Sequence, residues 1–266
     1  FFSSRRRHTR CSRDWSSACA LPIFRDGAVA ILGDSHVEGF AFPIEQSVGR
    51  RIEALAGSSL GGKVLNLGFR GAGPSEQLRI LDWIRPHYKI VGAVWILTEN
   101  DILDEFYYNR LDQGGRITWL SQTLTVISEK FFARRWYTFE WLRIVTHSLA
   151  KIQSVKAGYD GAALSKRFCR VITSIRQRLP ANAPVHVIGI PHGRPADGLP
   201  YFGAQLDKAS FWNALECARA AGVPVIDQRE FYSSLYTHYL PDRYHLDAEG
   251  TERWARRILQ DMGVSH

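Results

Sequence analysis

Residues 28–42 read AVAILGDSHVEGFAF, an apolar run that stops abruptly at small and polar residues. The run covers residues 28–32 and ends at Gly33, after which come an aspartate, Ser35 and a histidine. A second glycine, Gly39, follows four residues after the serine. A short stretch that is apolar throughout is typical of a strand buried on both faces. This strand delivers a hydroxyl group, and the rest of the chain indicates what that hydroxyl is for.

Similar apolar runs recur and predict parallel strands at 29–32, 64–67, 93–97, 185–190 and 223–226. Helical patterns alternate with them at 44–57, 74–86, 211–222 and 247–263. In the first helical pattern Ile44, Val48, Ile52 and Leu55 share one face, and Asp247 is a suitable N-cap for the last. The alternation predicts a doubly wound α/β/α sandwich with a five-stranded parallel sheet, of the flavodoxin-like type.

One segment breaks this alternation. Between the third and fourth strands we predict a helical insertion at about 110–180, which contains the aromatic and basic stretch KFFARRWYTFEWLRI at 130–144. Its spacing is typical of a helix that packs inward on a core. The alternatives are a lid, a ligand-binding surface or a membrane-surface helix.

The beginning of the chain does not follow this pattern. Residues 1–22 contain five arginines against one aspartate, with no periodicity and no apolar segment of a signal peptide. They resemble the conceptual translation of sequencing-adapter DNA, and the alternative is a basic disordered tail. We therefore expect residues 1–23 to be a non-native or disordered head and residues 24–266 to be a single domain. The native amino terminus, with any localisation signal, is then expected to be missing.

Composition excludes several classes of function. The head contributes +4 of the formal net charge of +8, so the remainder is only weakly basic and does not indicate nucleic-acid binding. No window of 18 consecutive apolar residues predicts a transmembrane helix. Outside the head, Cys169 and Cys217 are expected to be buried free thiols. No C-x-x-C, H-E-x-x-H or phosphate-loop motif occurs, so we predict no metal and no cofactor.

Functional groups in a doubly wound sheet gather beyond the carboxyl ends of the strands, where Ser35 is expected. A serine nucleophile needs a base and a group that orients the base. His245 has Asp242 three residues before it, so the carboxylate can hold one imidazole nitrogen and leave the other free. His36 is expected to point elsewhere if Ser35 faces the pocket.

Two more loops follow predicted strands. The glycine-rich NLGFRGAG at 66–73 suits a close approach of backbone to a ligand, and Asn100 in LTENDI could donate its amide to an oxyanion. An Asx turn or a helix cap is the alternative role for Asn100.

These four loops, in this order, resemble the four sequence blocks of the SGNH hydrolases, also called GDSL-like esterases or lipases. GDSHVEG resembles the first block, NLGFRG the second, TEND the third and DRYH the fourth. The resemblance implies a Ser35, His245 and Asp242 triad, with an oxyanion hole made by the N–H groups of Ser35 and Gly71 and the amide of Asn100.

The chain departs from the family pattern at two places. A histidine follows the serine where the best-known members have leucine, and G-D-S-H resembles relatives attached to polysaccharide acyltransferases. Thr98 and Glu99 replace the usual glycine that starts the third block, and we expect Glu99 to point away from the pocket.

The resemblance implies a serine esterase that acts on an acylated carbohydrate or a small ester. Two alternatives stay open: a polysaccharide O-acyltransferase with the same residues, and a non-catalytic glycan-binding or interaction module. Membrane association and oligomeric state are undetermined. Both the cell envelope or periplasm and the cytoplasm stay open as the compartment.

Overall fold

The computed structural model describes residues 27–39, 42–60, 63–105, 160–192, 208–240, 242 and 244–264. Its strands are β1 (Ala28–Gly33), β2 (Lys63–Gly68), β3 (Ile90–Thr98), β4 (Val185–Ile190) and β5 (Val225–Asp227). They form one sheet in the order β2-β1-β3-β4-β5, and every neighbouring pair is parallel. This is the predicted doubly wound topology, so the expected fold class is confirmed.

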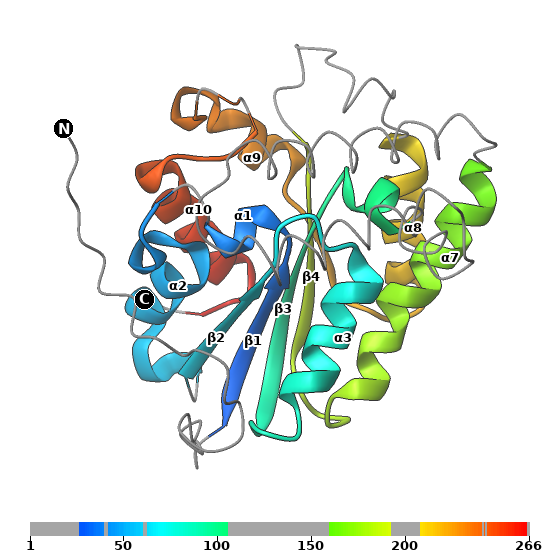
Figure 1. Ribbon diagram of the computed structural model, residues 1–266, viewed down its shortest axis with the longest axis horizontal. Helices are drawn as coiled ribbons and strands as arrows, with labels where there is room; N and C mark the ends of the chain where they lie inside the picture. The colour runs from blue at the N-terminus through cyan, green and yellow to red at the C-terminus, as the bar shows by residue number, and fades with distance from the viewer. Residues whose placement is uncertain are drawn as a thin grey trace, which may run out of the picture.

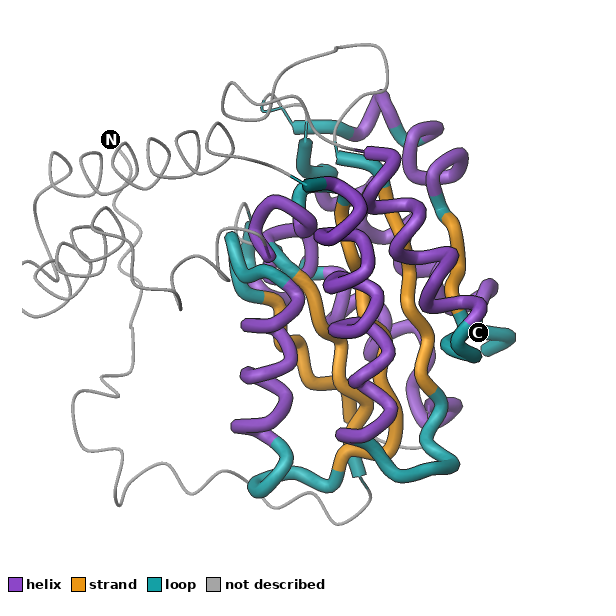
Figure 2. The backbone as a smooth tube through the Cα atoms, turned by 90° about the vertical axis from the view of Figure 1, so that its right-hand side faces the viewer, coloured by secondary structure: helices purple, strands orange, loops and turns teal. Residues whose placement is uncertain are grey.

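Helices cover both faces of the sheet (Figures 1 and 2). The helices on one face are α3 (Pro74–Ile84), α7 (Gly161–Thr173) and α8 (Lys208–Ala220). Those on the other face are α2 (Val48–Ala56), α9 (Arg229–Ser234) and α10 (Ala248–Asp261). Strand residues alternate between the two cores: Ala30 and Leu32 of β1 join the first, and Val29 and Ile31 join the second. Both faces are therefore buried, which explains why the strands are apolar throughout.

Two predicted boundaries differ from the structure. The helix expected from residue 44 begins at Val48, because a short 3₁₀ helix, Ile44–Gln46, and an extended Ser47 precede it. Ile44 is consequently 56% exposed and not on the buried face. The fifth strand begins two residues later than predicted, because the Val223 N–H donates to the Ala218 carbonyl at the end of α8.

The last part of the predicted insertion is the helix α7. Its side chains Leu164, Phe168 and Ile172 are buried in the same core as α3 and α8. In the chain α7 lies between β3 and β4, so it is a crossover helix of the sandwich. The stretch 130–144 and the head 1–23 lie outside the described residues.

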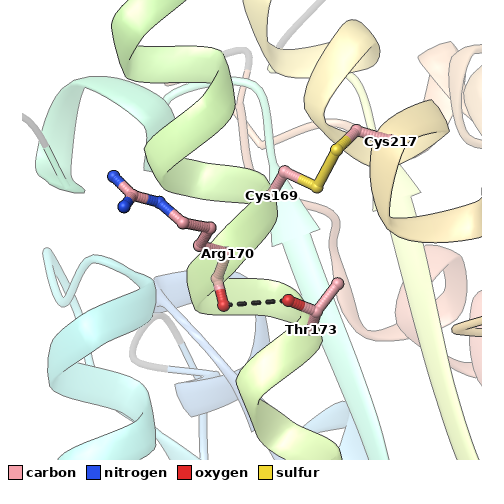
Figure 3. Close-up of a disulfide and its surroundings, with 4 residues drawn as sticks. All are labelled: Cys169, Arg170, Thr173 and Cys217. Carbon is pink, nitrogen blue, oxygen red and sulfur yellow. Dashed lines mark hydrogen bonds between the residues drawn. A yellow bond between two sulfur atoms is a disulfide. The ribbon is translucent and has the colours of Figure 1, made fainter. Parts of the chain in front are cut away.

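Cys169 of α7 and Cys217 of α8 form a disulfide, which corrects the expectation of free thiols (Figure 3). Their Cα atoms lie 5.9 Å apart although 48 residues separate them in the sequence. Cys169 is buried, whereas Cys217 lies at an exposed position. The positions of the two cysteines in the sequence do not predict this pairing, because the pairing depends on α7 packing against α8.

Candidate active site

The turn between β1 and α1 (Ser35–Glu38) explains the residues that end the first strand. At Gly33 there is no room for a side chain, because a Cβ atom would lie 2.4 Å from Cγ2 of Val37. Asp34 caps α1, and its Oδ1 accepts the His36 N–H at 2.9 Å. Ser35 is therefore the first residue of a short helix beyond the carboxyl end of β1 (Figure 1). This is where a parallel sheet of this type places its functional groups.

Ser35 meets His245 and Asp242 although 210 residues separate the serine from the histidine. Ser35 Oγ lies 2.8 Å from His245 Nε2, and His245 Nδ1 lies 2.6 Å from Asp242 Oδ2. The other oxygen of Asp242 accepts the backbone N–H groups of Tyr244 and His245, at 2.9 and 3.0 Å. The carboxylate is thus fixed by its own turn, and it orients the imidazole toward the serine. The structure brings these three predicted site residues together.

The surroundings favour a neutral His245. Burial lowers the pKa of His245, and the charge of His36 lowers it further, while Asp242 opposes both effects. Burial works against ionisation of Asp242, but the two backbone N–H groups and His245 lower the pKa of that carboxyl. With Nδ1 donating to an ionised Asp242, Nε2 is left as an acceptor for the Ser35 hydroxyl proton. That is the protonation state of a general base.

His36 lines the same crevice as Ser35 and His245, which corrects the expectation that it would point elsewhere, and it is part of a connected polar network. Its Nδ1 lies 3.1 Å from Asp34 Oδ1, and its Nε2 lies 3.2 Å from the carbonyl oxygen of Tyr244. The Thr98 hydroxyl at the end of β3 donates to Asp34 Oδ2 at 3.0 Å. The nucleophile turn, the base-bearing loop and β3 are therefore joined through one buried carboxylate. The G-D-S-H departure was the sequence signal for this network.

Gly71 lies in the loop after β2, in a left-handed conformation with φ of +71° that favours glycine. The loop is anchored to α1, because Glu38 Oε2 accepts the Arg70 N–H at 2.8 Å and the two side chains form an ion pair. Among the described residues no group accepts the N–H of Gly71 or that of Ser35. Within the described part of the chain, both N–H groups are therefore able to donate to a bound ligand.

Asn100 is buried at the carboxyl end of β3, but its side chain is held by neighbours. Its amide donates to Asp104 Oδ2 at 3.1 Å, and its Oδ1 shares the single hydroxyl hydrogen of Thr98 with Asp34. No hydrogen bond within the described residues joins Asn100 to Ser35. An amide nitrogen carries two hydrogens, so a second donor remains after the bond to Asp104.

Glu99 and Asp101 flank Asn100 and are both buried. Glu99 accepts the His192 N–H at 3.1 Å and the Trp212 indole N–H at 2.9 Å, and it pairs with Lys208 of α8. This agrees with the expected orientation of Glu99 away from the pocket.

Asp101 instead secures the end of β3, where its Oδ2 accepts the Thr98 N–H at 2.7 Å. Burial raises the pKa of Asp101 well above its usual range, and the nearby charge of Asp34 adds to the effect. Asp101 is the last residue of the TEND stretch, but the sequence alone assigned it no role.

A small crevice adjoins the serine and its histidine. Its apolar lining comes from Phe42, Tyr232, Leu246 and Trp254. Within the described ranges no group of three or more His, Cys, Asp or Glu side chains is arranged to hold a metal ion. No helix in that part of the chain has both the length and the apolarity to cross a bilayer.

Comparison with solved structures reveals similar folds at low sequence identity. The structure of TesA is 13% identical, covers 88% of this chain and 97% of its own, and superposes with a TM-score of 0.53. The psychrotrophic esterase EstA from Pseudoalteromonas sp. is 12% identical, covers 89% and 96%, and has a TM-score of 0.50. A member of the lipolytic protein G-D-S-L family from Veillonella parvula is 12% identical, covers 88% and 96%, and has a TM-score of 0.49. No protein-family model and no curated protein sequence matches the chain.

Proposed function

We propose that this chain, which has the fold of the SGNH hydrolases, is a serine esterase with Ser35 as nucleophile, His245 as base and Asp242 as orienting acid. The observation that carries the proposal is the continuous hydrogen-bonded path from Ser35 Oγ through His245 to Asp242, with distances of 2.8 and 2.6 Å. The similar solved structures support the fold, and the contacts among these three side chains support the chemistry.

The proposed reaction begins when His245 Nε2 removes the proton of Ser35 Oγ. The serine oxygen attacks the ester carbonyl carbon, and the carbonyl oxygen takes the electron pair as an oxyanion. When the tetrahedral intermediate collapses, the bond to the alcohol oxygen breaks and His245 transfers its proton to that oxygen. In the second half, His245 activates a water that attacks the acyl-enzyme, which releases the acid and restores Ser35.

We assign the oxyanion hole to the N–H groups of Ser35 and Gly71 and to the second amide hydrogen of Asn100. The support is that the two backbone donors have no acceptor among the described residues. Asn100 fits this role if the amide serves the oxyanion while it keeps its bond to Asp104. Donors that are fixed before the reaction are effective because they need no reorganisation when charge develops.

The proposed substrate is an acylated carbohydrate or another small ester. Its support is the G-D-S-H motif, together with the apolar lining beside the serine. A polysaccharide O-acyltransferase would use the same residues with a sugar hydroxyl in place of water. A non-catalytic glycan-binding module would keep the fold and bind without turnover.

A panel of p-nitrophenyl esters from acetate to palmitate, run on the protein and on Ser35→Ala, tests the proposal. We expect turnover by the first protein and loss of at least about 10³-fold in the variant. Adding a glycan acceptor separates the two enzymatic functions, because a transferase produces acylated glycan and a hydrolase only free acid. Equal, negligible rates for both proteins with every ester and acceptor would favour the binding module.

A further inference from the structure

We propose that His36 is a positioning residue, held as a cation between Asp34 and the base-bearing loop, which keeps His245 neutral and directed at Ser35. The kinetic consequence rests on the proposed esterase function, whereas the charge state of His36 can be tested without any activity. No part of the assigned triad or oxyanion hole includes this side chain.

Both ring nitrogens of His36 face acceptors. Nδ1 lies 3.1 Å from a carboxylate oxygen of Asp34, and Nε2 lies 3.2 Å from the carbonyl oxygen of Tyr244. A carbonyl oxygen can only accept a hydrogen bond, and so can an ionised carboxylate. A neutral imidazole has one N–H and could satisfy only one of these partners, so the full set of contacts requires the doubly protonated ring.

Asp34 is arranged to be the anion of this pair. Besides the imidazole, its oxygens accept the His36 N–H at 2.9 Å and the Thr98 hydroxyl at 3.0 Å. Burial opposes ionisation of Asp34, but His36 and these donors hold the pKa of the carboxyl well below its usual range. Burial likewise acts against a charged His36, and the Asp34 carboxylate more than offsets it and raises the pKa of the imidazole above 6.5.

The cation lies next to the proposed base. The ring centroids of His36 and His245 are 4.7 Å apart, with His36 buried and His245 half-buried. A positive charge at this range disfavours a second one, so it opposes protonation of His245. Among the described residues, the titratable groups that face the two histidines include Asp34, His192, Tyr232 and Asp242.

His36 also fixes the position of His245. The Tyr244 carbonyl that it contacts belongs to the residue directly before His245, and the Tyr244 N–H is bound by Asp242. The position of Tyr244 and His245 is therefore fixed by their hydrogen bonds to Asp242 and by the contact of His36 in α1 with the Tyr244 carbonyl. This contact connects the loop that carries the base to α1, in which His36 directly follows Ser35.

The kinetic test compares His36→Gln and His36→Leu with the unaltered protein in kcat/KM from pH 5 to 9. Without the cation the pKa of His245 rises, so the acidic limb should move up by about 1 pH unit or more. We expect about a tenfold loss at pH 5.5 that shrinks toward pH 8.5, with a smaller loss for glutamine, which can still donate to Tyr244. His87→Gln, an exposed histidine at the opposite end of the sheet, should leave the profile unchanged. An equal loss at every pH would overturn the proposal.

The independent test is ¹⁵N NMR of histidine-labelled protein at pH 7, with His36→Leu used to assign the signals. We expect both ring nitrogens of His36 to be protonated and the Nε2 of His245 to be unprotonated, in the unaltered protein and in Ser35→Ala. A neutral His36 would overturn the proposal whether or not the protein hydrolyses esters. A charged His36 in a protein that turns over no ester would instead contradict the proposed function alone.

Discussion

Ser35 Oγ and His245 Nε2 lie 2.8 Å apart at the carboxyl end of the sheet, and β1 and the loop before α10 carry them there. The contact depends on the topology, because β1 is an interior strand of the sheet and α10 packs against α2. A hydroxyl near the beginning of the domain thereby reaches a base near its end.

Replacing Asp242 by asparagine should preserve the fold and remove most of the activity. The amide cannot hold Nδ1–H of His245 as the carboxylate does, so the ring loses both its orientation and the tautomer that accepts from Ser35. We expect kcat to fall by about 10²–10⁴-fold, measured on p-nitrophenyl acetate at pH 8. Asp82→Asn, an exposed aspartate of α3, is the matched control and should retain full activity. Activity of Asp242→Asn within a factor of three of the control would contradict the role of Asp242.

Replacing Asn100 by alanine tests whether its amide donates to the oxyanion in addition to its hydrogen bond with Asp104. Loss of one oxyanion donor costs about 10²–10³-fold in kcat, whereas loss of the bond to Asp104 affects stability. We therefore expect a fall in kcat of that size at a temperature well below the melting point of the variant. A variant with lower stability and unchanged kcat would show that Asn100 only supports the structure.

His192 makes stability depend on pH. Burial lowers the pKa of His192 to about 3, and the cation of His36 contributes to the shift. The unfolded chain binds a proton at this residue below about pH 6.5 and the folded chain does not, so stability is full above 6.5 and is lost as pH falls. Between pH 7.5 and 5 the loss from this one residue should be about 2 kcal/mol.

Urea unfolding of the unaltered protein and of His192→Phe at both pH values measures this effect. Phenylalanine keeps a ring that can stack on Tyr244, whose centroid is 4.5 Å from that of His192. We expect the free energy of unfolding of the variant to fall less on acidification. The same pH dependence in both proteins would show that His192 is protonated in the fold.

Reduction of the disulfide should lower stability with little effect on the chemistry. The link between Cys169 and Cys217 closes a loop of 48 residues, and the chain-entropy relation assigns it about 4 kcal/mol. We expect the Cys169→Ala and Cys217→Ala double variant to melt about 10 °C lower and to keep its activity at 25 °C. Alkylation followed by mass spectrometry should modify these two cysteines only after reduction. Alkylation of both without a reductant would contradict the pairing.

Much of the fold could be predicted because local patterns and topology agree. Each β-rich apolar run became a strand, and the Asp247 side chain caps α10 by accepting the Gly250 N–H at 2.7 Å. The contact of Asp242 with His245 was predictable as well, since two residues that are three positions apart in a turn have neighbouring side chains.

The features that were missed depend on distant parts of the chain. His36 meets the carbonyl of Tyr244 across 208 residues, and Cys169 meets Cys217 only after two helices have packed on the sheet. The helical character of α7 was expected, but the pattern of Leu164, Phe168 and Ile172 does not say which layer it joins. Local spacing carries no information on such pairings, and they follow from how the layers assemble.

The central claim is that Ser35 is a nucleophile activated by His245, and labelling with a fluorophosphonate tests it most directly. Peptide mass mapping of the labelled protein should locate a single phosphonyl adduct on Ser35. His245→Ala should abolish the adduct, while His87→Gln leaves it intact. An unmodified Ser35 in the folded protein, or an adduct that forms equally fast without His245, would contradict the account.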